Sequence, residues 1–114
     1  MIDLDAYTDF CESVWVTPFG ISPNDDGSLS KSAQVMTLGL AGEVGEVMEY
    51  IKKYVRDGTV NGDLLRKELG DVFFYWCMIA RHFGYTPEEI INANVEKLQG
   101  RVQRGTQQGS GDLR

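Results

Sequence analysis

Histidine and cysteine are scarce in this 114-residue sequence, which contains one histidine, His82, and two cysteines, Cys11 and Cys77. The cysteines lie far apart and form no C-x-x-C pair, so we expect neither a disulfide scaffold nor a zinc site, and a reducing cytosol fits better. A di-iron helical bundle requires Glu-x-x-His on its helices. No glutamate stands three residues before His82, which excludes that class of metal site.

The sequence also lacks an excess of basic residues and any long apolar run. It has 11 lysines and arginines against 17 aspartates and glutamates, a net charge of -6. Nucleic acid polymers favour a basic face, so none is expected as a partner. The longest apolar run, Val72–Ala80, is too short to span a bilayer, and the acidic N-terminus is unlike a signal peptide. We therefore expect a soluble cytoplasmic protein without a membrane partner.

Alternating strand patterns are absent, and helical periodicity predicts four helices over about 4–15, 30–56, 63–83 and 86–100. The last begins at a capping box, with Thr86 as N-cap, Pro87 at the first position and Glu89 at the third. The fold class is thus all-α, with one domain over residues 1–104. Residues 105–114 are polar and glycine-rich, and predict either a disordered, flexible tail or a mobile lid.

The apolar residues of these helices indicate how they pack. The segment Val72–Ala80 is apolar on every side, so the third helix should be central and the most buried. The second helix has one apolar stripe. The fourth should turn its apolar residues inward. The stripe of the second helix comprises Leu40, Val44, Val47, Ile51 and Val55, and the inward residues of the fourth are Ile90, Ile91, Val95 and Leu98.

Two segments of the second and third predicted helices repeat the same pattern at an offset of 25 residues. The first is Leu40-x-x-Glu43-Val44-Gly45-Glu46-Val47-x-x-Tyr50-Ile51, and the second is Leu65-x-x-Glu68-Leu69-Gly70-Asp71-Val72-x-x-Tyr75-Trp76. In each segment the two acids are separated by about 60° around the helix, one turn apart. If the helices form an antiparallel hairpin, the two pairs of acids face each other across a pseudo-twofold axis.

Four carboxylates beside an apolar core would repel one another and be costly to desolvate. Hard divalent cations relieve this repulsion, because Mg²⁺ prefers oxygen ligands and tolerates a partly aqueous shell. A carboxylate cluster without histidine therefore points to Mg²⁺, with Mn²⁺ as a substitute. A single Glu-x-x-Glu is more often a solvated helix face, but the repeat beside a wholly apolar helix favours a metal site at Glu43, Glu46, Glu68 and Asp71.

Basic and aromatic residues near this pattern suit a phosphorylated ligand. Lysine and arginine are common phosphate donors, although each is individually also typical of a protein surface. The basic candidates are Lys52, Lys53, Arg56, Lys97, Arg101 and Arg104. Trp15 and Phe19 flank the first loop and are the aromatic candidates for contact with a nucleobase, although core packing is the commoner role of such rings.

The pairs Glu43-x-x-Glu46 and Glu68-x-x-Asp71 match the E-x-x-E and E-x-x-D signature of the all-alpha NTP pyrophosphohydrolase superfamily, with 21 residues between the pairs. The stretches GLAGEVGEVMEYIKKYVRDG and KELGDVFFY closely resemble MazG-like proteins. The end, from Asn94-x-x-Lys97 to Arg104-Gly105, is similar to short phage-type members. The resemblance covers roughly residues 32–112 and implies a four-helix, MazG-like, oligomeric fold.

The resemblance also implies roles for individual residues. Glu43, Glu46, Glu68 and Asp71 would hold Mg²⁺ ions bridging a triphosphate, and a water activated by metal or carboxylate would attack the α-phosphorus. Glu46 and Glu49 are both candidates for orienting that water. Lys53 falls where the family places a phosphate-binding lysine, and Asn94 and Lys97 match its late N-x-x-K contact.

The implied activity is conversion of a (d)NTP to the (d)NMP and pyrophosphate by a homodimer or homotetramer, with sites completed by a neighbouring chain. Phage-type relatives include some that remove dGTP, so a purine dNTP such as dGTP is the first substrate expected. The alternative is a non-catalytic helical interaction module that keeps the acids to bind metal or a partner. The two differ in whether alanine at Glu46 or Asp71 abolishes turnover while the fold is retained.

Overall fold

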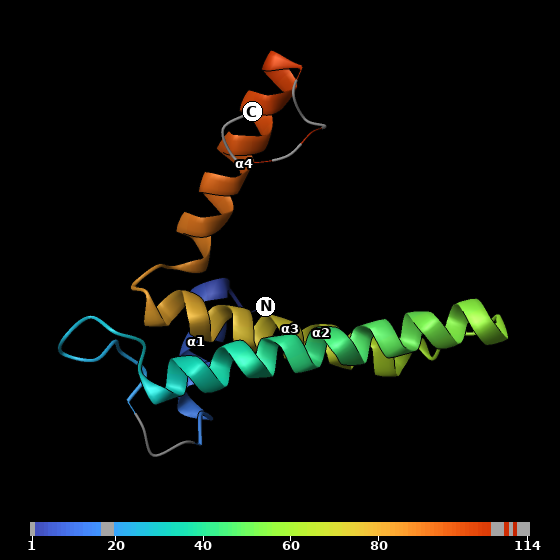
Figure 1. Cartoon of the computed structure of the whole chain (residues 1–114), viewed down its shortest axis with the longest axis horizontal. Coiled ribbons are helices and arrows are strands. Elements are labelled where there is room, and N and C mark those ends of the chain that lie inside the picture. The colour runs from blue at the N-terminus through green and yellow to red at the C-terminus, as the bar shows by residue number, and fades with distance from the viewer. Residues whose placement is uncertain (1, 17–19, 106–108, 110, 112–114) are drawn as a thin grey trace.

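The computed structural model describes residues 2–16, 20–105, 109 and 111, and Figure 1 shows its course. It contains four helices: α1 (Leu4–Ser13), α2 (Lys31–Asp57), α3 (Gly62–His82) and α4 (Pro87–Arg104). No strand occurs among the described residues. This confirms the predicted all-α, four-helix class.

Side-chain caps mark the helix starts, and Thr86 is the cap that the sequence predicted. Asp3 accepts a hydrogen bond from the backbone N–H of Ala6 at 2.7 Å, and Ser30 caps α2 by accepting from Ala33 at 3.2 Å. Thr86 caps α4 by accepting from Glu89 at 3.2 Å. These side chains satisfy amide donors that have no partner within the first helical turn, which is why the helices begin here.

The helix ends differ slightly from prediction. The fourth helix does not stop at Gly100 but continues to Arg104, and Gly105 closes it in the left-handed conformation. The first helix ends at Ser13, two residues before the predicted Trp15. The Trp15 indole donates from Nε1 to the Ser32 hydroxyl at 3.2 Å and stacks on Phe74. These contacts hold Trp15 outside the helix.

Helices α2 and α3 run antiparallel as the long hairpin that the repeat predicted, and they make the most extensive helix contacts in the described chain (Figure 1). The turn between them begins at Gly58, whose positive φ of 79° is accessible to glycine at little cost. The hairpin therefore places the two acidic segments side by side on neighbouring helices.

The core sits at one end of the hairpin, where α1 crosses α3. The fully buried apolar side chains there are Cys11, Met36, Cys77 and Met78. Around them pack partly buried aromatic rings, including Phe73 stacked on Trp76 with ring centroids 5.3 Å apart. Helix α3 is the only one of the four that contacts the other three within the described chain, which confirms its predicted central position.

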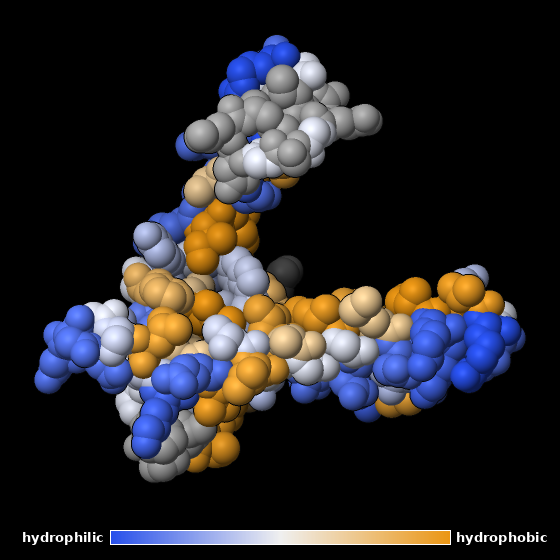
Figure 2. Space-filling view, in the orientation of Figure 1, coloured by the Kyte–Doolittle hydropathy of each residue, from blue (hydrophilic) through white to orange (hydrophobic). Residues whose placement is uncertain are grey.

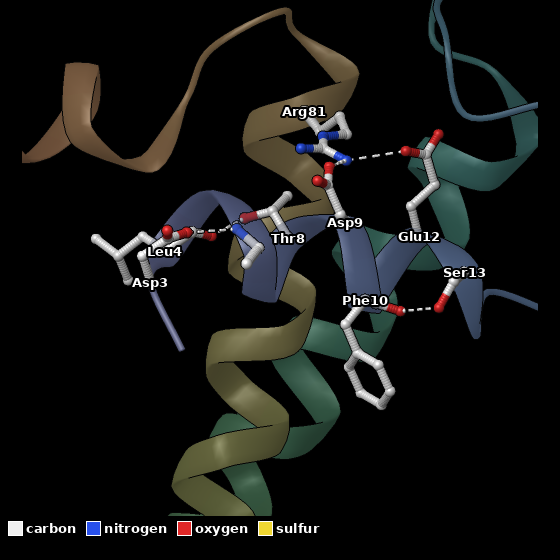
Figure 3. Close-up of polar contacts among 9 residues, drawn as sticks. Asp3, Leu4, Thr8, Asp9, Phe10, Glu12, Ser13 and Arg81 are labelled. Atoms are coloured by element: carbon white, nitrogen blue, oxygen red, sulfur yellow. Dashed lines mark hydrogen bonds and ion pairs between the residues drawn. The ribbon is translucent and has the colours of Figure 1, made fainter. Parts of the chain in front are cut away.

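A polar contact fastens α1 to α3 at the surface of this core. Figure 3 shows the Arg81 guanidinium of α3 reaching Asp9 and Glu12 of α1, at 2.8 and 2.9 Å. Arg81 is half-buried, and the two carboxylates raise its pKa even though burial opposes this. The contact fastens α1, which also carries Tyr7, to α3.

Helix α4 departs from prediction. It leaves the hairpin where α3 ends and points away from it, contacting only α1 and α3 within the described chain (Figure 1). Ile91, Val95 and Leu98, predicted to face inward, are 41%, 44% and 45% exposed, and Ile90 alone of the four is half-buried. The periodicity correctly marked an apolar face, but within the described residues most of that face stays exposed.

Two further predictions concern the membrane and the tail. No helix within the described residues is long and apolar enough to cross a membrane. The predicted tail at 105–114 lies mostly outside the described residues, so the division into a domain and a flexible tail stays a prediction. The carbonyl of Gly111 accepts a hydrogen bond from Arg101 at 3.0 Å, so this part of the tail lies beside α4.

Candidate metal centre

Three of the four predicted acids come together between α2 and α3. Glu43 of α2 and Glu68 and Asp71 of α3 each offer a carboxylate oxygen, and these oxygens all lie within 4.8 Å of one another. Glu43 and Glu68 are half-buried, whereas Asp71 is exposed. An oxygen-only donor set with one side open to solvent suits a hard divalent cation that retains water ligands.

Helices α2 and α3 also approach each other closely one turn away from the acids, at Gly39 and Tyr75. A Cβ atom added at Gly39 would lie 2.4 Å from the ring of Tyr75, so only glycine leaves space for that ring. By contrast, a Cβ at Gly45 or Gly70 would meet nothing within 4 Å. The glycines beside the acids therefore keep the surface open, while Gly39 allows the close packing.

The cluster is electrostatically unfavourable without a cation. The pKa of Glu43 is raised to about 7, first by burial, then by a hydrogen bond with Glu68 and by the negative charges of Asp71, Glu68 and Glu46. At neutral pH Glu43 therefore holds a proton for part of the time. A divalent cation would take the place of that proton, which is the behaviour expected of a metal ligand.

Glu46 and Glu49 differ in their surroundings. Glu46 is exposed and lies outside the group of three, but its charge contributes to the raised pKa of Glu43. Glu49 forms an exposed ion pair with Lys52 at 3.0 Å, and this lysine lowers the pKa of Glu49. Glu46 is therefore the more closely coupled of the two to the carboxylate cluster.

The sequence analysis did not identify Tyr7 of α1 as a neighbour of this cluster. Its ring stacks on Phe73 of α3, with centroids 5.4 Å apart. Burial raises its pKa, a hydrogen bond with Cys11 adds to this, and Asp71 is near enough to contribute. Tyr7 is thus an electrostatic neighbour of Asp71. Its helical spacing from Cys11 indicated only a core position, because the packing of α1 across α3 is not visible in the sequence.

The basic candidates on α2 lie beyond the acids. Lys53 lies over the ring of Tyr50, with Nζ 5.7 Å from its centroid, and Arg56 forms an exposed pair with Asp57 at 2.8 Å. Glu46, Tyr50 and Lys53 are spaced four and three residues apart, so they share one face of the helix. A chain of phosphates that begins at the carboxylates can therefore extend along α2 toward Lys53.

The candidates on α4 lie on a helix that contributes none of the three clustered acids and makes no contact with α2 in the described structure. Asn94 and Lys97 line an open hollow of about 540 Å³. The other residues lining it are Tyr85, Glu89, Ile90 and Ala93, none of which was predicted as a site residue. Arg101 is buried, and Arg104 lies exposed near Gly100.

The two aromatic candidates have different outcomes. Trp15 is half-buried and packs against Phe74 and Tyr75, with ring centroids 6.2 and 6.3 Å apart. In the described structure its ring is therefore a packing residue. Phe19 lies outside the described residues.

Comparison with known proteins matches this arrangement to a family. Residues 31–105 match the model of the MazG nucleotide pyrophosphohydrolase domain, a span that contains all three clustered acids. The chain belongs to the MazG family. It is also 42% identical over 84 residues to the Gene 37 protein of Mycobacterium phage L5, covering 69% of this chain and 74% of that protein.

This relative supports the predicted phage-type membership of the MazG family. No solved structure matches the chain significantly. Helix α1 precedes the matched span and is the one helix of the described chain that the family model does not cover.

Proposed function

We propose that this protein hydrolyses a nucleoside triphosphate to the monophosphate and pyrophosphate, with divalent metal held by Glu43, Glu68 and Asp71. The observation that carries the proposal is the convergence of these three carboxylates within 4.8 Å, in a chain of the MazG nucleotide pyrophosphohydrolase family. Carboxylates so close together serve no evident packing role, and their mutual repulsion is relieved by a cation.

The donor set fits Mg²⁺, with Mn²⁺ as a substitute, because all three groups are carboxylates and one side of the cluster is open. Glu46 is proposed as a fourth ligand from the adjacent turn of α2. When bound, the metal would neutralise charge on the triphosphate and so make its α-phosphorus easier to attack.

The reaction itself requires a water and a group that takes its proton. The water oxygen bonds to the α-phosphorus, the bond from this phosphorus to the α,β-bridging oxygen breaks, and pyrophosphate leaves. Among the two candidate acids we assign the orientation of water to Glu46, because Glu49 is already paired with Lys52 and is not coupled to the cluster. A carboxylate there would accept the proton released by the water.

Phosphate contacts are proposed for Lys53 and Arg56 on α2, and for Asn94, Lys97, Arg101 and Arg104 on α4. Only the first two share a helix with metal-binding acids. Helix α4 does not contact α2 of its own chain in the described structure, and we infer that its residues act at this site from a second copy. The proposal therefore includes a homo-oligomer, either dimer or tetramer.

A purine dNTP such as dGTP is the proposed substrate, with the half-buried Trp15 as the aromatic residue proposed to contact its base. The test is incubation with each dNTP and NTP in Mg²⁺ or Mn²⁺, with separation of the products by chromatography. We expect monophosphate and pyrophosphate, lost with EDTA and with Glu68→Gln, but retained with Glu49→Gln. A folded protein that binds Mn²⁺ but turns over no nucleotide would favour the alternative, a metal-binding interaction module.

A further inference from the structure

Glycine directly follows an aspartate or an asparagine at three places in the chain. These are Asp26-Gly27 in the loop before α2, Asp57-Gly58 at the end of α2, and Asn61-Gly62 at the start of α3. The last two lie at the end of the hairpin that projects from the core (Figure 1), and Figure 2 shows this end standing clear of α4. All six residues are exposed, so water reaches each pair.

Pairs of this kind can react within the chain, because glycine has no β-carbon to hinder attack by its backbone nitrogen on the preceding side chain. With asparagine, that nitrogen forms a bond to Cγ and the bond from Cγ to the amide nitrogen breaks. Ammonia leaves, taking the proton of the glycine N–H, and a five-membered succinimide remains. Water then opens the ring at one of its two carbonyl carbons, which gives either aspartate or isoaspartate. An ionised aspartate reacts poorly, because its carboxylate is a weak electrophile.

Asp57-Gly58 is held in an unreactive state. The Gly58 N–H, whose nitrogen would be the nucleophile, donates to the Tyr54 carbonyl at 2.7 Å. Asp57 accepts two hydrogen bonds from Arg56, both at 2.8 Å, and these lower the pKa of its carboxyl group. The carboxylate therefore stays charged, and both reacting groups of this pair are engaged.

Asp26-Gly27 is held in the same way. The Gly27 N–H donates to the Asn24 carbonyl at 2.8 Å. One carboxylate oxygen of Asp26 accepts hydrogen bonds from the hydroxyl and the backbone N–H of Ser28, and these lower the pKa of the carboxyl group. This pair, too, lacks both an available nucleophile and a reactive carbonyl carbon.

Asn61-Gly62 has neither form of protection. The side chain of Asn61 is a neutral amide, and its Oδ1 accepts a hydrogen bond from the backbone N–H of Leu64 at 3.1 Å. This bond draws electron density away from Cγ, where the attack would occur. Gly62 is the first residue of α3, so its N–H has no acceptor within the helix, and it donates to no other group in the described part of the chain.

We propose that Asn61-Gly62 is a site of spontaneous deamidation, at which the Gly62 nitrogen displaces ammonia from the Asn61 side chain and water then yields aspartate and isoaspartate. Of the three pairs, this one alone combines a neutral electrophile with an unengaged nucleophile and exposure to water. The inference does not depend on the proposed enzymatic activity.

The two products should affect α3 differently. Asn61 is the N-cap of this helix, which also carries Glu68 and Asp71. Aspartate at position 61 keeps the capping oxygen and adds a negative charge at the N-terminus of the helix, where it is favourable. Isoaspartate inserts an additional methylene into the backbone and so removes the cap. The reaction therefore alters the start of the helix that supplies two of the three clustered acids.

Peptide mass spectrometry of the full chain, kept at mildly alkaline pH for increasing times, tests the site. The peptide that contains Asn61 should change from the mass of the amide to that of the acid, with an equal amount of ammonia released. An isoaspartate-specific methyltransferase should label this peptide and not those that contain Asp26 or Asp57. Gly62→Ala is the matched control and should slow the reaction at least about tenfold. Its Cβ would meet nothing within 4 Å, so the fold should be retained.

An unchanged Asn61 peptide, over a time in which a synthetic peptide of residues 57–65 deamidates, would overturn the proposal. Equal rates in wild type and Gly62→Ala, or labelling of the Asp26 or Asp57 peptide to the same extent, would also overturn it. Urea unfolding tests the effect on α3. Asn61→Asp should unfold at no lower urea concentration than fresh wild type, whereas aged wild type rich in isoaspartate should unfold at a lower one. Equal midpoints for fresh and aged protein would refute the loss of the cap.

Discussion

Lowering the pH from about 8 to about 6 should weaken Mg²⁺ or Mn²⁺ binding to the free protein about tenfold. Glu43, whose pKa is about 7, must lose its proton to serve as a ligand. It is then about 90% protonated at the lower pH and about 10% at the higher, which gives the tenfold difference. Isothermal titration calorimetry in buffers of different ionisation enthalpy should detect release of about one proton per site at pH 6.

Two substitutions test whether Glu43 is the group that titrates. Glu43→Gln removes the ligand and the titrating group together, so binding should be much weaker and independent of pH over this range. Glu49→Gln changes an acid of the same helix that is paired with Lys52 and should leave binding as in wild type. Equal affinities at both pH values, with no proton released, would refute the placement of Glu43 in the metal site.

The same titration has a consequence for stability without metal. The folded pKa of Glu43 is raised above its ordinary value of 4.5, so the folded state binds this proton more tightly than the unfolded chain. The free energy of unfolding should therefore fall as the pH rises from about 4.5 to 7. Glu43→Gln should unfold at a higher temperature than wild type at about pH 8, and at a similar one near pH 5. Mg²⁺ should stabilise wild type at the higher pH and the variant little.

Two further predictions concern packing and phosphate contact. Gly39→Ala should destabilise the protein by about 1–3 kcal/mol, because its Cβ would overlap the Tyr75 ring, whereas Gly45→Ala should be neutral or slightly stabilising, as measured by urea unfolding. Equal effects of the two would contradict the close approach. Lys53→Ala should raise KM for the triphosphate several-fold, while Lys52→Ala, which loses only an exposed ion pair, should not.

The hairpin and most of its acidic site could be predicted from the sequence. The repeat at an offset of 25 residues placed Glu43 and Glu68 at equivalent positions on two helices, and antiparallel packing of α2 and α3 then brings them together. The two acids of one helix lie one turn apart by helical geometry, so placing them needed no information from distant residues. What the repeat did not reveal is that Glu46 lies outside the closest group.

There is a physical reason why the direction of α4 could not be predicted from the sequence. An amphipathic pattern states that one face of a helix needs an apolar partner, but not which chain supplies it. Ile91, Val95 and Leu98 satisfy that pattern equally well against their own core or a second copy. The position of Tyr7 could not be predicted for a similar reason, because it comes near Asp71 only through the packing of α1 against α3.

The site of bond cleavage is the most direct test of the account. The protein should be incubated with dGTP and Mg²⁺ in water enriched in ¹⁸O, and the products resolved by mass spectrometry. The account predicts one ¹⁸O atom in the monophosphate and none in the pyrophosphate, because water attacks the α-phosphorus. Label in the pyrophosphate, or release of orthophosphate with the diphosphate, would contradict it.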